Sequence, residues 1–341
     1  MKKIFLIGLT AAAMMASCSN DETVEMAQQK AISFSNAFVN NGTRSVDDPS
    51  FTTLTLKDFA VYGFTQKGQI FNGEKVSKGG TAWSYDNVQY WVPGNTYTFG
   101  AIAPYSVAGN VSNVTLPTGA AKVEMKVAFT NTDADQVDLL HAEPAQITGV
   151  TASYTAPVFM TFNHQLSKVK FSFQNSVGEG YNVKVSNVKI TDAFKEGTLT
   201  VAATGNTWGG QTDKTLELNF GNVVANASST EASAIAYAAT LESYNEKLMI
   251  PMGSSAIYTV TFTAELFKDN VPLGIYNHRV EIKNVEFKLG YCYNFKASLT
   301  HENITGQDEL NPIVFDVKKV EDWNQAESNK DLNVPKTQSG I

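Results

Sequence analysis

Apolar and polar residues alternate with a period of two through most of this chain. Windows such as 168–175, 181–190 and 256–267 carry Val, Ile, Phe or Tyr at nearly every second position. Successive side chains of a strand point to opposite faces, so this pattern predicts half-buried β-strands. The windows with such alternation or with short apolar runs are 31–39, 54–64, 97–105, 122–130, 156–164, 168–175, 181–190, 199–204, 216–220, 256–267, 279–289, 291–300 and 313–320.

Clusters of Gly, Asn, Asp and Pro separate these windows. Many short strands between such turn residues indicate an all-β protein built from β-sandwiches. Helical patterns are few, and we expect at most a turn or two at residues 133–140 and 231–240. The sequence contains no tandem repeat at the period of a solenoid.

The chain is expected to divide into two sandwiches near FNHQLSKVKFSF (162–173). Residues 161–164 would end one set of strands, and residues 168–171 would begin another. The predicted N-terminal domain spans 45–165 and the C-terminal domain spans 166–325, both ordinary sizes for a sandwich. Residues 326–341 are polar with few apolar anchors, which predicts a flexible tail.

The first 18 residues, MKKIFLIGLTAAAMMASC, have the form of an export signal. Lys2 and Lys3 precede an apolar run that is too short to span a bilayer comfortably. A cysteine at the cleavage point predicts that residues 1–17 are a lipoprotein signal peptide and that Cys18 is acylated. An ordinary secretory signal is the alternative, and both take the protein out of the cytoplasm. The polar segment 19–23 is either a plain linker or a signal for export to the cell surface.

Composition narrows the classes of partner. The chain has 341 residues, a formal net charge of −7 and no cluster of basic residues. Nothing is therefore available to neutralise phosphates, which argues against nucleic acid. Cys18 and Cys292 are the only cysteines, so if Cys18 carries lipid the fold must be held by packing without a disulfide framework.

No pattern supports catalysis, a metal or a cofactor. The four histidines occur without His-x-x-x-His or Cys-x-x-Cys spacing. Asp138, His141 and Glu143 are close in sequence, but we interpret them as a polar turn before Pro144 rather than an acid–base site. His164 is interpreted as a hydrogen-bonded residue at the domain junction. The chain is therefore predicted not to be an enzyme.

An aromatic cluster supports a second hypothesis. Trp83, Tyr85, Tyr90 and Trp91 lie close together in a predicted loop region. Aromatic side chains near a loop can stack on sugar rings, although they also fit a packing turn. We prefer packing, and keep a monomeric surface glycan-binding lipoprotein as the alternative function.

Several phrases resemble the fimbrillin family of Bacteroidota, the subunits of type V pili. YWVP at 90–93 and YTFGAIAP at 97–104 resemble its W-x-P turn and the strand after it. DLLHA at 138–142 and FNHQLSKV at 162–169 resemble the end of its N-terminal domain, and GYCYNF at 290–295 with VEDW at 320–323 resembles its C-terminal signature. The resemblance implies two transthyretin-like β-sandwich domains and a structural subunit of an adhesive surface fimbrium.

Arginine usage suggests a processing site. Only Arg44 and Arg279 are arginines. Arg279 falls in an alternating strand, whereas Arg44 lies among Asn, Gly, Asp and Pro in a predicted loop. An Arg-specific protease acting on the folded protein is therefore expected to cut after Arg44, which makes Ser45 the first residue of the mature chain.

The resemblance implies that cleavage after Arg44 leads to polymerisation. In type V pilins the lipidated N-terminal strand is removed after Arg, and a strand of a neighbouring subunit fills the groove. Here the propeptide would be residues 18–44, with Ile32, Phe34 and Phe38 in the displaced strand. The candidate donor strand contains Ile313, Phe315 and Val317, which could instead form the last strand of the C-terminal domain; Leu332 and Val334 are a second candidate. The implied partners are other fimbrial subunits, an Arg-specific protease and, before processing, the outer membrane through the lipid.

Overall fold

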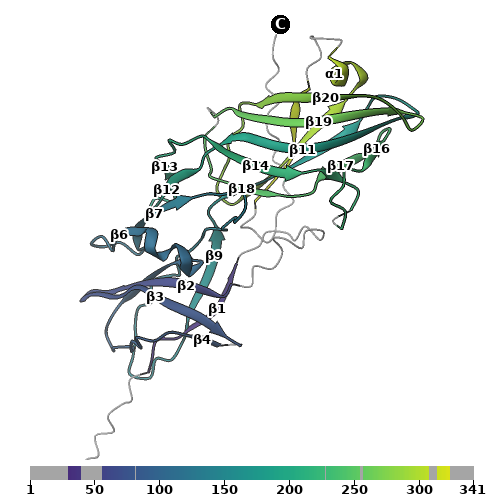
Figure 1. Cartoon of the computed structure of the whole chain (residues 1–341). Helices are drawn as coiled ribbons and strands as arrows, with labels where there is room; N and C mark the ends of the chain where they lie inside the picture. Colours follow the sequence, from purple (N-terminus) through teal and green to yellow (C-terminus); the bar gives the residue numbers. More distant parts are fainter. Residues whose placement is uncertain are drawn as a thin grey trace, which may run out of the picture.

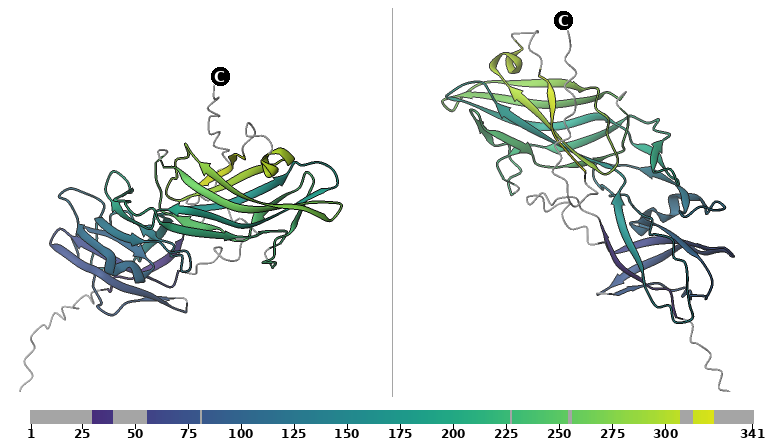
Figure 2. Two further views of the ribbon diagram at one scale, coloured as in Figure 1. Left: turned by 45° about the horizontal axis from the view of Figure 1, so that its top comes forward. Right: turned by 180° about the vertical axis from the view of Figure 1, so that it is seen from behind.

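The computed structural model describes residues 30–39, 56–80, 82–226, 228–253, 256–306 and 313–322. Nearly all of the regular secondary structure in the described residues is β-strand, which confirms the predicted all-β class. Figure 1 shows an elongated molecule, with β1 to β4 toward one end and β19, β20 and α1 toward the other. Figure 2 shows the same two-part arrangement from two further directions.

A seven-stranded sheet forms the N-terminal end. Its order is β1-β9-β8-β5-β2-β3-β4, and all of its pairings are antiparallel except that of β1 with β9. The bounds are β1 (Phe34–Val39), β2 (Asp58–Thr65), β3 (Gly68–Gly79), β4 (Ala82–Ser84), β5 (Tyr97–Ala103), β8 (Leu140–Ala142) and β9 (Val158–His164). A 3₁₀-helix, η1 (Tyr105–Asn110), follows β5.

Two sheets form the C-terminal end. The six-stranded sheet contains β10 (Ser167–Asn175), β15 (Val223–Val224), β17 (Thr240–Ser243), β18 (Lys247–Met249), β21 (Tyr291–Leu299) and β22 (Phe315–Asp322). The five-stranded sheet contains β11 (Tyr181–Ala193), β14 (Leu216–Gly221), β16 (Ala234–Ala236), β19 (Tyr258–Lys268) and β20 (Val271–Ile282). Alternate residues of both sheets face a shared apolar core that includes Phe171, Phe173 and Phe262.

A four-stranded sheet joins the two ends. It pairs β6 (Val111–Thr115) and β7 (Glu124–Thr130) with β12 (Glu196–Val201) and β13 (Thr207–Gly209). Its core mixes residues from both sides of position 165, such as Val127 and Leu199. The boundary at 165/166 stays a prediction, but strands from beyond it complete a sheet with β6 and β7, so the two parts share packing as well as a linker.

The structure corrects several local expectations. The expected helical turns at 133–140 and 231–240 are wrong, since these stretches contain bends and lead into β8 (Leu140–Ala142) and β16. The window 279–289 is also displaced, because β20 begins at Val271 and ends at Ile282. The pattern missed β3, whose sequence GQIFNGEKVSKG carries mainly polar residues and glycine. Its hairpin with β2 supplies the pairing that its own sequence does not signal.

A short helix, α1 (His301–Thr305), follows β21 and is set by local chemistry. The Asn303 amide N–H donates to Thr300 Oγ1 at 3.2 Å, and the Thr300 N–H donates to Asn303 Oδ1 at 2.9 Å. This reciprocal capping box begins the helix, and Gly306 ends it with a left-handed φ of 69°. Within the described ranges, no helix has the length and apolar character needed to cross a bilayer.

Candidate functional site

The candidate site is the segment 30–39, which closes the N-terminal sheet. Its first half bonds to the stretch after β4: the Ile32 N–H donates to the Gln89 carbonyl at 2.7 Å, and the Trp91 N–H donates to the Lys30 carbonyl at 2.9 Å. At Ser33 the pairing changes sides, where the Ser33 carbonyl accepts from the Val158 N–H at 2.8 Å. β1 then continues in parallel along β9. One short segment therefore bridges two parts of the sheet through its backbone.

Two side chains of this segment enter the core. Ile32 is 1% exposed and Phe34 is 4% exposed. The Phe34 ring has four aromatic neighbours at centroid distances between 5.6 and 6.1 Å, namely Phe59, Phe71, Tyr85 and Phe99. Full burial of an Ile or Phe side chain stabilises by about 1.5–3 kcal/mol, and each well-placed aromatic pair adds about 0.5–1.5 kcal/mol. The segment is thus an integral part of the N-terminal core.

Tyr85 holds the same segment through a polar contact. Its hydroxyl donates to the Ile32 carbonyl at 2.6 Å and accepts from the Gln89 N–H at 3.3 Å. Burial raises the pKa of Tyr85, and the nearby Glu74 and Tyr90 also raise it, against a lowering effect of the hydrogen bond with Gln89. The phenol therefore stays protonated and remains a donor at neutral pH. The sequence pattern places Tyr85 in an aromatic cluster and does not reveal this role, because the contact joins residues 53 positions apart in the chain.

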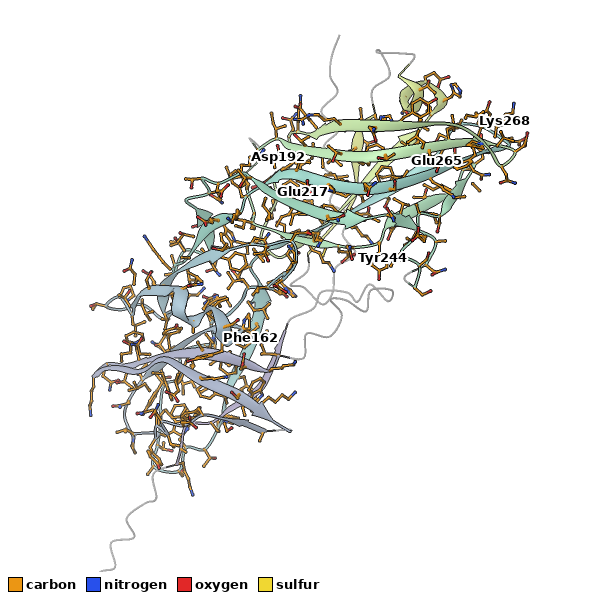
Figure 3. The ribbon with its side chains drawn as sticks, viewed as in Figure 1. Phe162, Asp192, Glu217, Tyr244, Glu265 and Lys268 are labelled. Atoms are coloured by element: carbon orange, nitrogen blue, oxygen red, sulfur yellow. The ribbon has the colours of Figure 1, made fainter. Side chains whose placement is uncertain are left out.

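The ladder of β1 ends close to the predicted processing site. After an irregularity beyond Ser35, the register places Phe38 opposite Thr161 and Val39 opposite Phe162. Phe162 lies on β9 (Figure 3) and is fully buried. Arg44 and Ser45, like Cys18, lie outside the described residues.

The candidate donor residues close the other end of the molecule. β22 pairs antiparallel with β21 at the edge of the six-stranded sheet. Ile313 is buried, and Phe315 packs against Phe171 and Phe173 with ring centroids 5.1 and 5.7 Å apart. Within this chain they therefore complete the C-terminal core, one of the two roles that the sequence left open for them. Val317 is half-buried beside the same core, and Leu332 and Val334 lie outside the described residues.

The structure changes the interpretation of the polar residues at the junction. Asp138 Oδ2 lies 2.8 Å from His164 Nδ1, and both side chains are almost fully buried. His141 lies on β8 and is also buried, so the expected polar turn is wrong. Burial lowers the pKa of His141 to about 4; among nearby charges, Glu143 raises it and Lys122 lowers it. His141 is therefore neutral at pH 7, and the buried pair is a packed junction rather than an open acid–base site.

The aromatic cluster packs inward. Trp91 is 2% exposed, and its ring contacts Tyr97 and Tyr154 with centroids 4.7 and 4.9 Å away. The Trp83 ring lies against Phe59 in the core, at 5.2 Å. Of the four cluster residues only Tyr90 is exposed, at 47%. The cluster therefore presents no aromatic surface of the kind that stacks on sugars. Within the described residues, no group of three or more His, Cys, Asp or Glu is arranged to hold a metal ion.

Comparisons with known proteins agree with this architecture. A fimbrial protein of Bacteroides vulgatus ATCC 8482 has a solved structure that matches with a TM-score of 0.60 at 16% identity, covering 86% of this chain and 99% of its own. A structure from Bacteroides ovatus ATCC 8483, described as a cell adhesion protein, matches with a TM-score of 0.49 at 17% identity, covering 87% and 98%. No curated protein matches the chain in sequence. The model of the fimbrillin-like family matches residues 43–323, and the chain therefore belongs to the fimbrillin-like family.

Proposed function

We propose that this protein is a structural subunit of an adhesive fimbrium that polymerises by strand exchange. It is exported as a lipoprotein acylated at Cys18, and an Arg-specific protease at the cell surface cuts it after Arg44. Removal of residues 18–44 opens a groove in the N-terminal sheet. A strand from a neighbouring subunit then fills that groove and links the two subunits.

The observation that carries this proposal is the placement of segment 30–39. It contributes Ile32 and Phe34 to the core, yet its ladder ends at Val39, five residues before Arg44. A cut after Arg44 would free the segment from the chain while leaving the rest of the sheet covalently intact. Loss of the segment would expose β9 as a sheet edge beside the aromatic side chains that now contact Phe34. An extended strand with matching alternate side chains fits such a groove by β-augmentation.

The other arginine supports selective cleavage at this point. Arg279 lies within the β19–β20 ladder, where it pairs with Thr261 and has paired residues on both sides along the strand. A protease must draw an extended segment into its active site, and a strand held in a sheet resists this. Arg44 is therefore the better substrate of the two.

The donor is best sought toward the C-terminus. Ile313, Phe315 and Val317 alternate as an incoming strand requires, but they now pack on the C-terminal core. Their use as donor requires β22 to leave β21, whereas use of Leu332 and Val334 does not. Both candidates lie within residues 313–341, and cross-linking between subunits can distinguish them.

The test is to follow the mature protein and the fimbria in cells that carry Arg44→Ala. We expect mass spectrometry of wild-type surface material to find a chain that begins at Ser45, and the variant to keep its acylated Cys18 and form no polymer. Arg279→Ala is the matched control and should polymerise normally. Cross-linking between residues 313–341 of one subunit and β9 of the next would identify the donor.

Two results would contradict the proposal. One is an intact, acylated Cys18 in assembled wild-type fimbriae, and the other is normal polymerisation of the Arg44→Ala variant. A folded Arg44→Ala protein that reaches the surface but forms no fimbria would support it, because folding needs segment 30–39 in place and strand exchange needs it removed.

A further inference from the structure

β20 is a long strand at the edge of the five-stranded sheet. It has 12 residues and pairs with β19, whereas β14 at the opposite edge has 6. Figure 1 shows it along the border of the C-terminal end, near α1. In the part of the chain that the structure describes, no strand pairs with its other side. An edge of this kind presents backbone N–H and C=O groups to which another strand can bind.

The first half of β20 is apolar and exposed. Val271 is 60% exposed, Leu273 is 48% exposed and Ile275 is 68% exposed. Ten large apolar side chains are exposed among the described residues, and three of them lie within these five positions. Soluble proteins usually protect an edge with charge or proline, but here Pro272 stands near the strand's start and Arg279 and Glu281 stand near its end. The centre has no such protection, which is typical of an interaction surface.

Charged residues of β19 flank this apolar half. Glu265 lies opposite Ile275 in the ladder, and Lys268 lies opposite Val271. Figure 3 shows both toward the far end of the C-terminal half. Along β19, the anionic Glu265 therefore lies beside Ile275 and the cationic Lys268 lies beside Val271. The second half of β20 carries the complementary order, a cation at Arg279 followed by an anion at Glu281.

We propose that β20 binds β20 of a second copy of this chain in an antiparallel edge-to-edge pairing. The twofold axis passes through Asn277, so that nearly the full length of both strands overlaps. Ile275 then faces Arg279 of the second copy, and Leu273 faces Glu281 of the second copy. The aliphatic stems of these charged residues cover the apolar side chains while their heads stay in water.

Charge complementarity selects this register. Arg279 of the second copy lies in the row that contains Ile275 and Glu265. Glu281 of the second copy faces Leu273, two positions along the strand from Val271, which pairs with Lys268. An axis moved to Arg279 would instead set two guanidinium groups opposite each other, which is unfavourable. Each contact occurs twice because the interface is isologous. The second copy is therefore a better match than an unrelated apolar strand.

The pairing is small, so a single contact is weak. We expect a dimer with a Kd on the order of tens of micromolar, at the transient end of protein interfaces. If the proposed fimbrium forms, the same edge repeats along each filament, and many weak contacts would bind filaments side by side. This consequence rests on the proposed function, whereas the dimer itself does not.

The experiment uses the chain from Ser19 onward with Arg44→Ala, which keeps segment 30–39 in place and blocks the proposed strand exchange. Sedimentation velocity at concentrations up to about 100 µM should show a reversible dimer. Ile275→Lys places a cation opposite Arg279 of the second copy and should weaken the dimer at least tenfold. Val88→Lys adds the same charge at an aliphatic side chain that is 45% exposed in the N-terminal half, and it should leave the dimer unchanged.

A cysteine at the axis tests the register. Asn277→Cys should form a covalent dimer under mild oxidation, because directly opposed residues of an antiparallel pair lie close enough for a disulfide. Val88→Cys should form no covalent dimer. It retains the native Cys292 just as Asn277→Cys does, so it controls for cross-linking through that residue. A wild type that stays monomeric, a dimer that Ile275→Lys leaves intact, or an Asn277→Cys protein that gives no covalent dimer would each overturn the proposal. None of these results bears on cleavage at Arg44, so the two proposals fail separately.

Discussion

The strands at the two ends of the described chain close their sheets in different ways. Segment 30–39 bonds to residues 89–91 on one side and to β9 on the other, and its Ile32 and Phe34 are almost fully buried. β22 pairs with β21 alone among the described strands, and its Phe315 and Val317 are half-buried. Apolar burial is thus more complete at the N-terminal closure than at the C-terminal one.

This difference bears on the direction of strand exchange. Free energy of burial scales with the apolar area removed from water. Transfer of side chains from a half-buried position on β22 into a groove that buries them fully would therefore be favourable. In the proposed strand exchange, the N-terminal groove would therefore bury incoming apolar side chains more completely than the site that β22 now occupies.

The largest expected effect is that of removing the Phe34 ring. Phe34→Ala should lower the free energy of unfolding by about 3–5 kcal/mol, because a buried Phe leaves both lost contacts and a cavity. Phe315→Ala should cost about half as much, since its ring is half-buried. Urea denaturation followed by tryptophan fluorescence measures both. A cost for Phe315→Ala that equals or exceeds that of Phe34→Ala would reverse the comparison.

Acid should weaken the N-terminal end. The pKa of the buried His141 is about 4 in the folded protein and about 6.5 in the unfolded chain. The unfolded chain therefore takes up its proton first as the pH falls. The contribution of neutral His141 to the free energy of unfolding is therefore complete above pH 6.5. It falls by up to about 3 kcal/mol as the pH drops toward 4.

His141→Gln is the variant that isolates this effect. The difference between the free energies of unfolding at pH 7 and at pH 4.5 should be smaller in the variant than in the wild type. Hydrogen exchange should assign the acid-induced loosening to β8 and β9 before β22. The same pH dependence in both proteins would show that another group is responsible.

The smallest expected effect is at the hydroxyl that holds segment 30–39. Tyr85→Phe removes the bond to the Ile32 carbonyl and should destabilise by about 1 kcal/mol. Tyr90→Phe is the control, because Tyr90 is largely exposed and its loss of a hydroxyl should be nearly neutral. Amide exchange at residues 30–39 should accelerate in Tyr85→Phe, and equal exchange in the two variants would argue against this contact.

Much of the fold follows from residue order because period-two alternation is a local property. Strands occupy nearly all of the windows 168–175, 181–190 and 256–267, and most of their apolar residues are buried, although Ile257 is exposed. The same pattern singled out Ile32 and Phe34, both of which are buried. Alternation cannot report β3, whose polar sequence is held by its hairpin with β2. It also cannot report that β12 crosses to pair with β7.

Functional residues divide in the same manner. Cys18 and Arg44 can be found from the sequence alone, because a lipoprotein signal peptide and an arginine in a loop are local signals. Acylation of Cys18 and cleavage after Arg44 stay predictions. Tyr85 stands out only in three dimensions, because its role is a hydrogen bond to a carbonyl far away in the chain. Asp138 and His164 stand 26 positions apart in the sequence, and their 2.8 Å contact depends on how β8 and β9 pair.

The sequence by itself determined the all-β class and the family resemblance, because both are written in the spacing of short segments. Only the tertiary structure decided that segment 30–39 closes a sheet between two partners and that β20 ends another sheet with an exposed apolar half. The physical reason is that pairing between distant strands depends on which backbone edges are left unsatisfied after every other strand has packed. Residue order encodes which face of a strand is apolar, whereas the neighbour that each strand receives is a property of the whole fold.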